Sequence, residues 1–156
     1  MGEVARILVI DDDENIRKVL KTILEDEGYA VDTAETAKEG IEKSENSFYN
    51  IALIDVRLPD MEGIELLSKL RDTKPKMRKL IVTGYPTLQN AIAAVNKGAD
   101  AYVVKPFEVD KILETIREQL KKQEEERHYS EARVVEFIET RIKALEATGE
   151  STAKKA

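Results

Sequence analysis

Several polar residues with chemical potential stand at the ends of short apolar runs. The runs Arg6–Ile10 and Asn50–Ile54 each stop at aspartate, and two later runs stop at a threonine and a lysine. In an open parallel sheet, ligands bind beyond the carboxyl ends of the strands. We therefore expect five side chains to meet at one rim: Asp11, Asp12, Asp55, Thr83 and Lys105.

Three carboxylates within a few ångströms repel one another by roughly 1–4 kcal/mol per pair. Either their pKa values rise or a cation relieves the repulsion. Oxygen ligands with room for water favour Mg²⁺ or Mn²⁺ over zinc. An aspartate placed there can act as a nucleophile toward a phosphoryl group, with Lys105 and Thr83 contacting the phosphoryl oxygens. A single aspartate at a strand end is more often a turn residue or helix cap. Only the five residues together indicate a site for a metal ion and a phosphoryl group.

The elements that must position these residues alternate along the first 122 residues. Apolar runs predict strands at Arg6–Ile10, Asn50–Ile54, Leu80–Val82 and Ala101–Val104, and an alternating pattern predicts one at Tyr29–Thr33. Amphipathic spacing predicts helices between Asp13 and Gly28, and at Thr36–Ser44, Ile64–Leu70, Thr87–Asn96 and Glu108–Lys122. Such alternation indicates an α/β fold with a doubly wound, five-stranded parallel sheet.

Composition excludes several classes of protein. The 156 residues are 42% apolar and 36% charged, include no cysteine and one histidine, and carry a net charge of −6. Disulfide scaffolds, thiolate metal sites and histidine-based zinc sites are therefore excluded. All the excess acid lies before Leu120, which disfavours nucleic-acid binding. No apolar run is long enough for a membrane span, and no signal peptide is evident, so we expect a cytoplasmic protein.

Four separated segments resemble the motifs of response-regulator receiver domains (CheY-like) in two-component signalling. The resemblance covers about residues 4–122 and implies a flavodoxin-like (βα)5 fold with strand order 2-1-3-4-5 and a receiver domain at 1–122. The matching segments are Ile7–Asp13, Leu53–Gly63, Val82–Gly84 and Tyr102–Phe107.

The resemblance also implies roles for the residues at the rim. Asp55 is expected to accept a phosphoryl group from the phosphohistidine of a sensor histidine kinase or phosphotransfer protein. Asp12, Asp55 and the backbone carbonyl of Arg57 are expected to bind Mg²⁺, or Mn²⁺, with Asp11 acting mainly through a metal-bound water. Lys105 is expected to pair with the phosphoryl oxygens.

Further implied roles concern signalling and lifetime. Thr83 is expected to hydrogen-bond the transferred group, and Tyr102 to turn inward as Thr83 moves. Pro106 is expected to follow a cis peptide bond. Arg57 and Tyr85 are large side chains at positions that flank the attacking water, so we expect slow hydrolysis. The signalling surface, about residues 87–122, consists of the fourth helix, fifth strand and fifth helix, and is one possible homodimer interface.

The segment after Lys122 has a different pattern. Residues 123–147 are predicted to be a helical extension, and 148–156 a disordered tail. Four apolar residues follow the 3-4-3 spacing of a coiled coil: Val135, Ile138, Ile142 and Leu145. Residues 134–145 could pack on the receiver, form a homodimer, dock on a partner or be a simple structural helix. His128 is expected to be a solvated helix residue.

Two alternatives to a phosphorylation switch remain from the sequence. One is a degenerate receiver that binds its partner constitutively, which the complete set of rim residues argues against. The other is a Mg²⁺-dependent phosphohydrolase with an aspartyl nucleophile. Arg57 stands where such an enzyme has its acid/base aspartate, two residues after Asp55. We therefore expect no enzyme activity beyond the domain's own phosphoryl transfer and autodephosphorylation.

Overall fold

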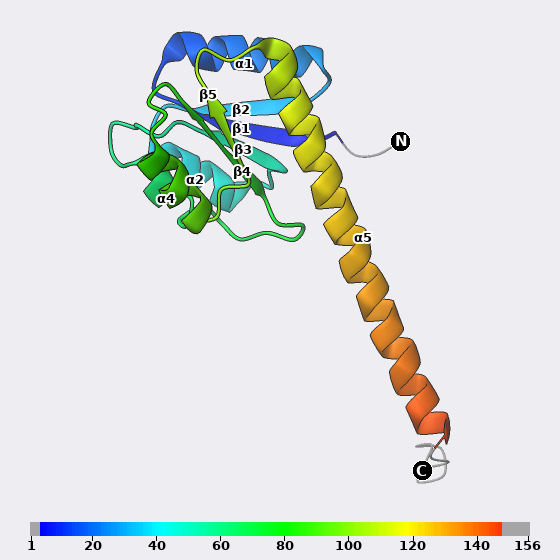
Figure 1. Cartoon of the computed structure of the whole chain (residues 1–156). Coiled ribbons are helices and arrows are strands. Elements are labelled where there is room, and N and C mark those ends of the chain that lie inside the picture. Colours follow the sequence, from blue (N-terminus) through cyan, green and yellow to red (C-terminus); the bar gives the residue numbers. More distant parts are fainter. Residues whose placement is uncertain (1–3, 148–156) are drawn as a thin grey trace. The chain divides into compact units, whose positions relative to one another are not determined.

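Five strands alternate with five helices along residues 4–147, the part of the chain that this computed structural model describes (Figure 1). The strands are β1 (Arg6–Ile10), β2 (Ala30–Ala34), β3 (Ile51–Ile54), β4 (Arg78–Thr83) and β5 (Ala101–Val104). The helices are α1 (Glu14–Asp26), α2 (Ala37–Asn46), α3 (Gly63–Leu66), α4 (Leu88–Asn96) and α5 (Val109–Ala147).

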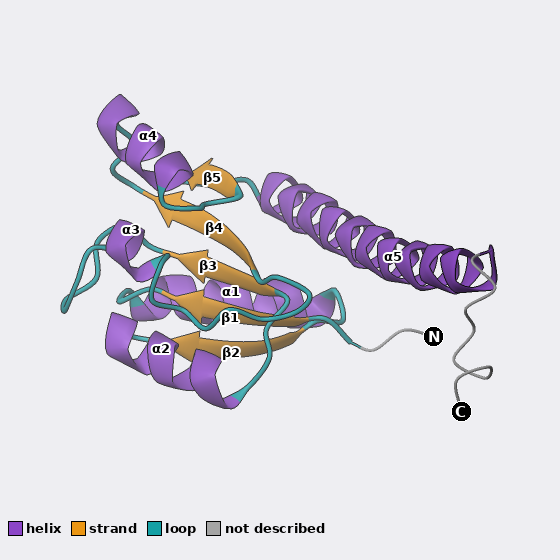
Figure 2. Cartoon of the chain, turned by 90° about the horizontal axis from the view of Figure 1, so that it is seen from below, coloured by secondary structure: helices purple, strands orange, loops and turns teal. Residues whose placement is uncertain are grey.

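All paired strands are parallel and follow the order β2-β1-β3-β4-β5, which confirms the predicted fold. Helices cover both faces of the sheet (Figure 2). Leu8 and Ile10 of β1 belong to the core shared with α2, α3 and α4, whereas Ile7 and Val9 face α1 and the start of α5. Because both faces are covered, the central strands β1 and β3 are continuous apolar runs, whereas the edge strand β2 contains the polar residues Asp32 and Thr33.

The ends of α1 follow the signals in the sequence. The carboxylate of Asp13 caps the helix and accepts hydrogen bonds from the amides of Asn15 and Ile16 at 2.8 and 3.2 Å. At the other end, Gly28 follows the last helical turn with a φ of +93°, a conformation that glycine adopts without steric cost.

Helix α3 is shorter than the predicted Ile64–Leu70 because tertiary contacts occupy the backbone groups that would extend it. The carbonyl of Leu67 accepts a hydrogen bond of 2.6 Å from the buried Nζ of Lys79. The amide of Arg71, which would otherwise bond that carbonyl, donates instead to the hydroxyl of Ser44 at 3.3 Å. Neither partner is visible in the local spacing.

Strand β4 begins two residues before the predicted Leu80, at two charged residues that are nevertheless buried. Arg78 contacts the carboxylate of Asp100 at 3.2 Å, and Lys79 reaches the Leu67 carbonyl described above. A buried cation is tolerated when it is paired or hydrogen-bonded. These contacts allow both residues to pair with β3, so the strand is longer than its apolar run.

The predicted helix Glu108–Lys122 and the predicted helical extension 123–147 form one continuous helix, α5, of 39 residues. No glycine or proline occurs between Val109 and Ala147, and residues 121–127 are all strong helix formers. The chain divides into two compact units, residues 1–123 and 124–156. The predicted disorder of Thr148–Ala156 lies outside the described residues.

Two buried glutamines one turn apart fasten the receiver part of α5 to the loops that precede the strands. Gln119 donates to the carbonyl of Asp100 at 3.3 Å. Gln123 donates to the carbonyls of Asn50 and Lys76 at 3.0 and 2.8 Å, and accepts from the side-chain amide of Asn50 at 2.9 Å.

Among the described helices, none is long and apolar enough to cross a membrane.

Candidate functional site

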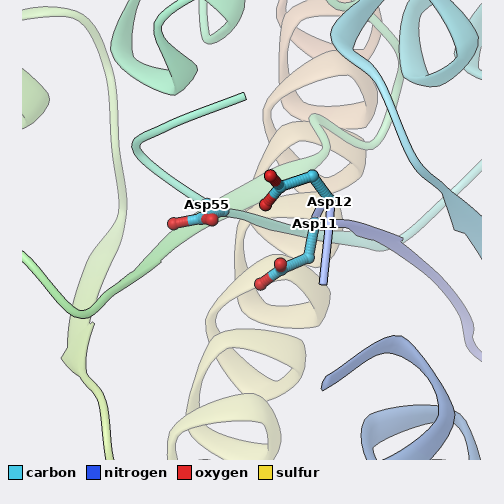
Figure 3. A group of neighbouring side chains, drawn as sticks. All are labelled: Asp11, Asp12 and Asp55. Carbon is cyan, nitrogen blue, oxygen red and sulfur yellow. The ribbon is translucent and has the colours of Figure 1, made fainter. Parts of the chain in front are cut away.

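The carboxyl ends of β1 and β3 bring three aspartates together at one edge of the sheet (Figure 3). Asp11, Asp12 and Asp55 each offer an oxygen atom, and these atoms lie within 4.8 Å of one another. Backbone hydrogen bonds hold the rim in place: the Asp11 amide donates to Ala34 at 3.1 Å and the Asp55 amide to Ile10 at 3.0 Å. Asp11 and Asp55 are buried, whereas Asp12 is exposed.

Lys105, directly after β5, supplies a positive charge to this group. Its Nζ lies 2.7 Å from Oδ2 of Asp11 and 3.7 Å from Oδ2 of Asp55. The ammonium is therefore hydrogen-bonded to Asp11 and stands next to Asp55 without bonding it. One cation facing several carboxylates leaves net negative charge in the site, which favours the binding of a further cation.

Asp55 is the most strongly perturbed carboxylate of the three. Burial raises the pKa of Asp55 from 3.8 to about 6, and the negative charges of Asp11 and, to a smaller extent, Asp12 act in the same direction. Lys105 and the backbone of Arg57 lower that pKa but do not compensate. The buried Oδ1 atom of Asp55 accepts no hydrogen bond from any of the described residues. Asp55 thus carries an oxygen that lacks a partner.

The donor set fits a hard divalent cation. Carboxylate oxygens, one exposed side and an unsatisfied Oδ1 are the features that Mg²⁺ uses when it retains several waters. Among the described residues, no cysteine or histidine lies with the three aspartates, so the site lacks the sulfur and nitrogen ligands that softer metals prefer. The three aspartates are able to bind a metal ion.

A cleft of about 440 Å³ opens over the aspartates, and two large side chains meet at its wall. The guanidinium carbon of Arg57 lies 3.9 Å from the centre of the Tyr85 ring, which is a cation–π contact. Arg57 comes from the loop after β3 and Tyr85 from the loop after β4. The stack therefore joins the two loops beside Asp55.

Thr83 and Tyr102 do not line this cleft. Thr83 is fully buried, and its hydroxyl accepts a hydrogen bond from the Tyr85 amide at 2.9 Å. Tyr102 packs against the core beneath α4, and its hydroxyl is buried without a hydrogen-bond partner among the described residues. The bond between Lys105 and Pro106 is cis.

Two residues support the site in ways that the sequence did not reveal. A Cβ atom on Gly63 would lie 1.9 Å from the carbonyl oxygen of Asp55, so the start of α3 can approach the phosphoacceptor candidate only as glycine. Arg17 donates to the carbonyl of Asp11 at 2.7 Å, a contact between α1 and the rim. A lone arginine on an exposed helix face gives no signal of such a role.

Comparison with known proteins identifies the class. Residues 7–117 match the family model described as the response regulator receiver domain. A crystal structure of a CheY-like receiver domain protein from Methanospirillum hungatei JF-1 is 51% identical, with a TM-score of 0.76 over 80% of this chain and 99% of that one. The chain therefore belongs to the response regulator receiver domain family.

Two curated relatives are longer proteins. The uncharacterized transcriptional regulatory protein YkoG of Bacillus subtilis strain 168 is 34% identical over 76% of this chain and 52% of its own length. The transcriptional regulatory protein ZraR of Klebsiella oxytoca is also 34% identical, over 76% of this chain and 27% of its own length. The chain thus spans about half or less of the curated relatives named here.

Proposed function

We propose that Asp55 accepts a phosphoryl group from a phosphohistidine and that the resulting acyl phosphate switches the domain. The observation that carries this proposal is the buried, unpartnered Oδ1 of Asp55 beneath an open cleft, with the Lys105 ammonium 3.7 Å from its other oxygen. In the transfer, the phosphorus–nitrogen bond of the donor breaks as a phosphorus–oxygen bond to Asp55 forms. Lys105 then balances charge on the phosphoryl oxygens.

The aspartates would hold Mg²⁺, or Mn²⁺, through the side chains of Asp12 and Asp55 and the carbonyl of Arg57, with Asp11 acting through water. The ion would neutralise charge on the incoming phosphoryl group. The partner that delivers this group is a sensor histidine kinase or phosphotransfer protein, which places the exchange in the cytoplasm. The domain catalyses only its own phosphorylation and dephosphorylation.

The response to phosphorylation would pass through Thr83 and Tyr102. Thr83 does not line the cleft, so its hydroxyl must move toward the phosphoryl oxygens before it can donate to them. It can keep accepting from the Tyr85 amide, now at 2.9 Å, only if the β4–α4 loop moves with it. Movement of the β4–α4 loop would change the packing of Tyr102 beneath α4. We assign the signalling surface to α4, β5 and the start of α5, where Leu88 and Val95 are 78% and 70% exposed.

We assign residues 1–122 to the receiver and 123–147 to a helical extension, whose first residue, Gln123, is hydrogen-bonded to loops of the receiver. Within the receiver, the stacked pair Arg57 and Tyr85 would slow hydrolysis of the acyl phosphate. Both side chains line the cleft and are stacked at 3.9 Å, so they would restrict the approach of water to phosphorus. A phosphoryl lifetime well beyond seconds is the expected consequence.

Intact-mass measurement tests the proposal directly. The chain and an Asp55→Ala variant are incubated with Mg²⁺ and acetyl phosphate, and separately with a phosphorylated histidine kinase. We expect one phosphoryl group on the parent and none on the variant. A gain in both proteins would mean that another residue is the acceptor, and no gain from either donor would leave a constitutive binding module.

A further inference from the structure

The second unit, residues 124–147 as described, carries a row of apolar side chains that face solvent. Val135, Ile138 and Ile142 are 54%, 51% and 50% exposed. Their separations of three and four residues place them along one side of the helix, and Leu145 continues the spacing. We call this row the apolar seam. Solvent-exposed apolar rows of this kind mark interaction sites.

We infer that the apolar seam binds the same seam of a second copy of this chain, in a parallel, two-stranded coiled coil. In heptad terms, Val135 and Ile142 occupy a positions, and Ile138 and Leu145 occupy d positions. Branched residues at a with leucine at d favour two parallel strands, a pattern that Val135, Ile142 and Leu145 follow and that Ile138 does not. The seam alone provides the contacts, so the inference does not depend on phosphorylation of Asp55.

The charges beside the seam select the parallel orientation. Arg141 occupies a g position and Glu146 the following e position. In a parallel dimer, Arg141 of one helix would form an ion pair with Glu146 of the other helix. Arg141 has no acidic residue three or four positions away in its own helix, so the sequence offers it no local ion pair. An antiparallel pair would instead bring the e residues Glu139 and Glu146 of the two helices together.

The seam has a defined upstream limit. The preceding a and d positions are the polar residues His128 and Glu131. His128 is engaged within its own helix, with Nε2 at 3.0 Å from Oε1 of Glu124, and Arg127 contacts the same oxygen at 2.7 Å. These residues do not need a second helix, and the paired segment therefore begins near Val134.

Cross-linking can read the orientation because the chain contains no cysteine. Single variants Val135→Cys and Ile142→Cys are prepared in the full chain and oxidised by copper phenanthroline, with Thr140→Cys, on the opposite side of the helix, as the control. A parallel dimer forms a disulfide in each a-position variant alone. In an antiparallel dimer each a residue packs against a d residue of the other helix, so neither a-position variant would form a disulfide alone, and a link would form only when Val135→Cys is mixed with Leu145→Cys. Either result would overturn the inference.

Sedimentation equilibrium of the unmodified chain supplies the second test. We expect a shift from 17.6 kDa toward twice that mass as the protein concentration rises about a hundredfold. Arg141→Glu should weaken dimerisation by placing like charges together, and Arg141→Glu with Glu146→Arg should restore it. A monomer at every concentration, a trimer, or a double variant no better than the single one would each overturn the inference.

Discussion

Replacing Asp55 by asparagine should stabilise the metal-free receiver, although it removes the proposed phosphoacceptor. The carboxylate is buried, faces Asp11 and Asp12, and carries an oxygen without a donor, and burial is the main reason that its pKa is raised to about 6. Folding therefore disfavours its ionised form. Asparagine keeps the shape of the side chain and has no charge to bury.

The size and pH window of the effect follow from that pKa. A rise from 3.8 to about 6 corresponds to roughly two pKa units, or at most about 3 kcal/mol at neutral pH. The attraction to Lys105 is already included in that pKa, and burying the polar asparagine amide offsets part of the gain, which leaves about 1–3 kcal/mol. The gain should be nearly complete above about pH 6, should fall as the pH drops from 6 to 3.8, and should vanish below 3.8, where the parent carboxyl is protonated in both states.

Thermal unfolding in EDTA measures this difference, with an expected rise in Tm of about 3–10 °C at pH 7.5. Asp60→Asn is a control of opposite sign, since that carboxylate accepts hydrogen bonds from the amides of Ala37 and Lys38 at 2.9 Å each, which lowers its pKa. Adding Mg²⁺ should raise the Tm of the parent more than that of Asp55→Asn. An Asp55→Asn protein that melts below the parent in EDTA, or a difference that persists unchanged at pH 4, would refute the reasoning.

Two further substitutions probe the surroundings of Asp55. Gly63→Ala should lower stability by at least about 2 kcal/mol and abolish phosphorylation, because the new Cβ would overlap the Asp55 carbonyl. Gly84→Ala is the control: its Cβ would meet only ordinary contacts, so stability and phosphorylation should be unchanged. Thermal melting and intact mass measure the two properties in both variants. Arg57→Ala and Tyr85→Ala should each speed loss of the phosphoryl group, and in the double variant the effects should fall short of additive by about 0.5–2 kcal/mol, the strength of a cation–π contact. Strict additivity of the two rate effects would show that the stack does not act as a unit.

The arrangement of the aspartates could be predicted because it depends on strand ends, and strand ends are visible as the points where apolar runs stop. Asp11 and Asp55 follow such runs directly, and the parallel topology places them at the same edge. The same logic located Lys105 after β5. No knowledge of side-chain packing was needed.

Features set by contacts between distant segments could not be predicted in this way. The capture of the Leu67 carbonyl by Lys79 shortens α3, and the ion pair between Arg78 and Asp100 allows β4 to begin with a charge. Neither pairing has a local signature. The requirement for glycine at position 63 likewise arises from a backbone approach that only the folded structure reveals.

The hydrogen bonds of Gln123 bear on where this chain can be divided. The family match ends at residue 117, yet Gln123 serves the carbonyls of Asn50 and Lys76 and the side-chain amide of Asn50. A fragment cut at the end of the match would leave these groups without their partner, at a cost of about 1–3 kcal/mol for each one that stays buried. A receiver fragment should therefore extend at least to Gln123, six residues beyond the end of the family match.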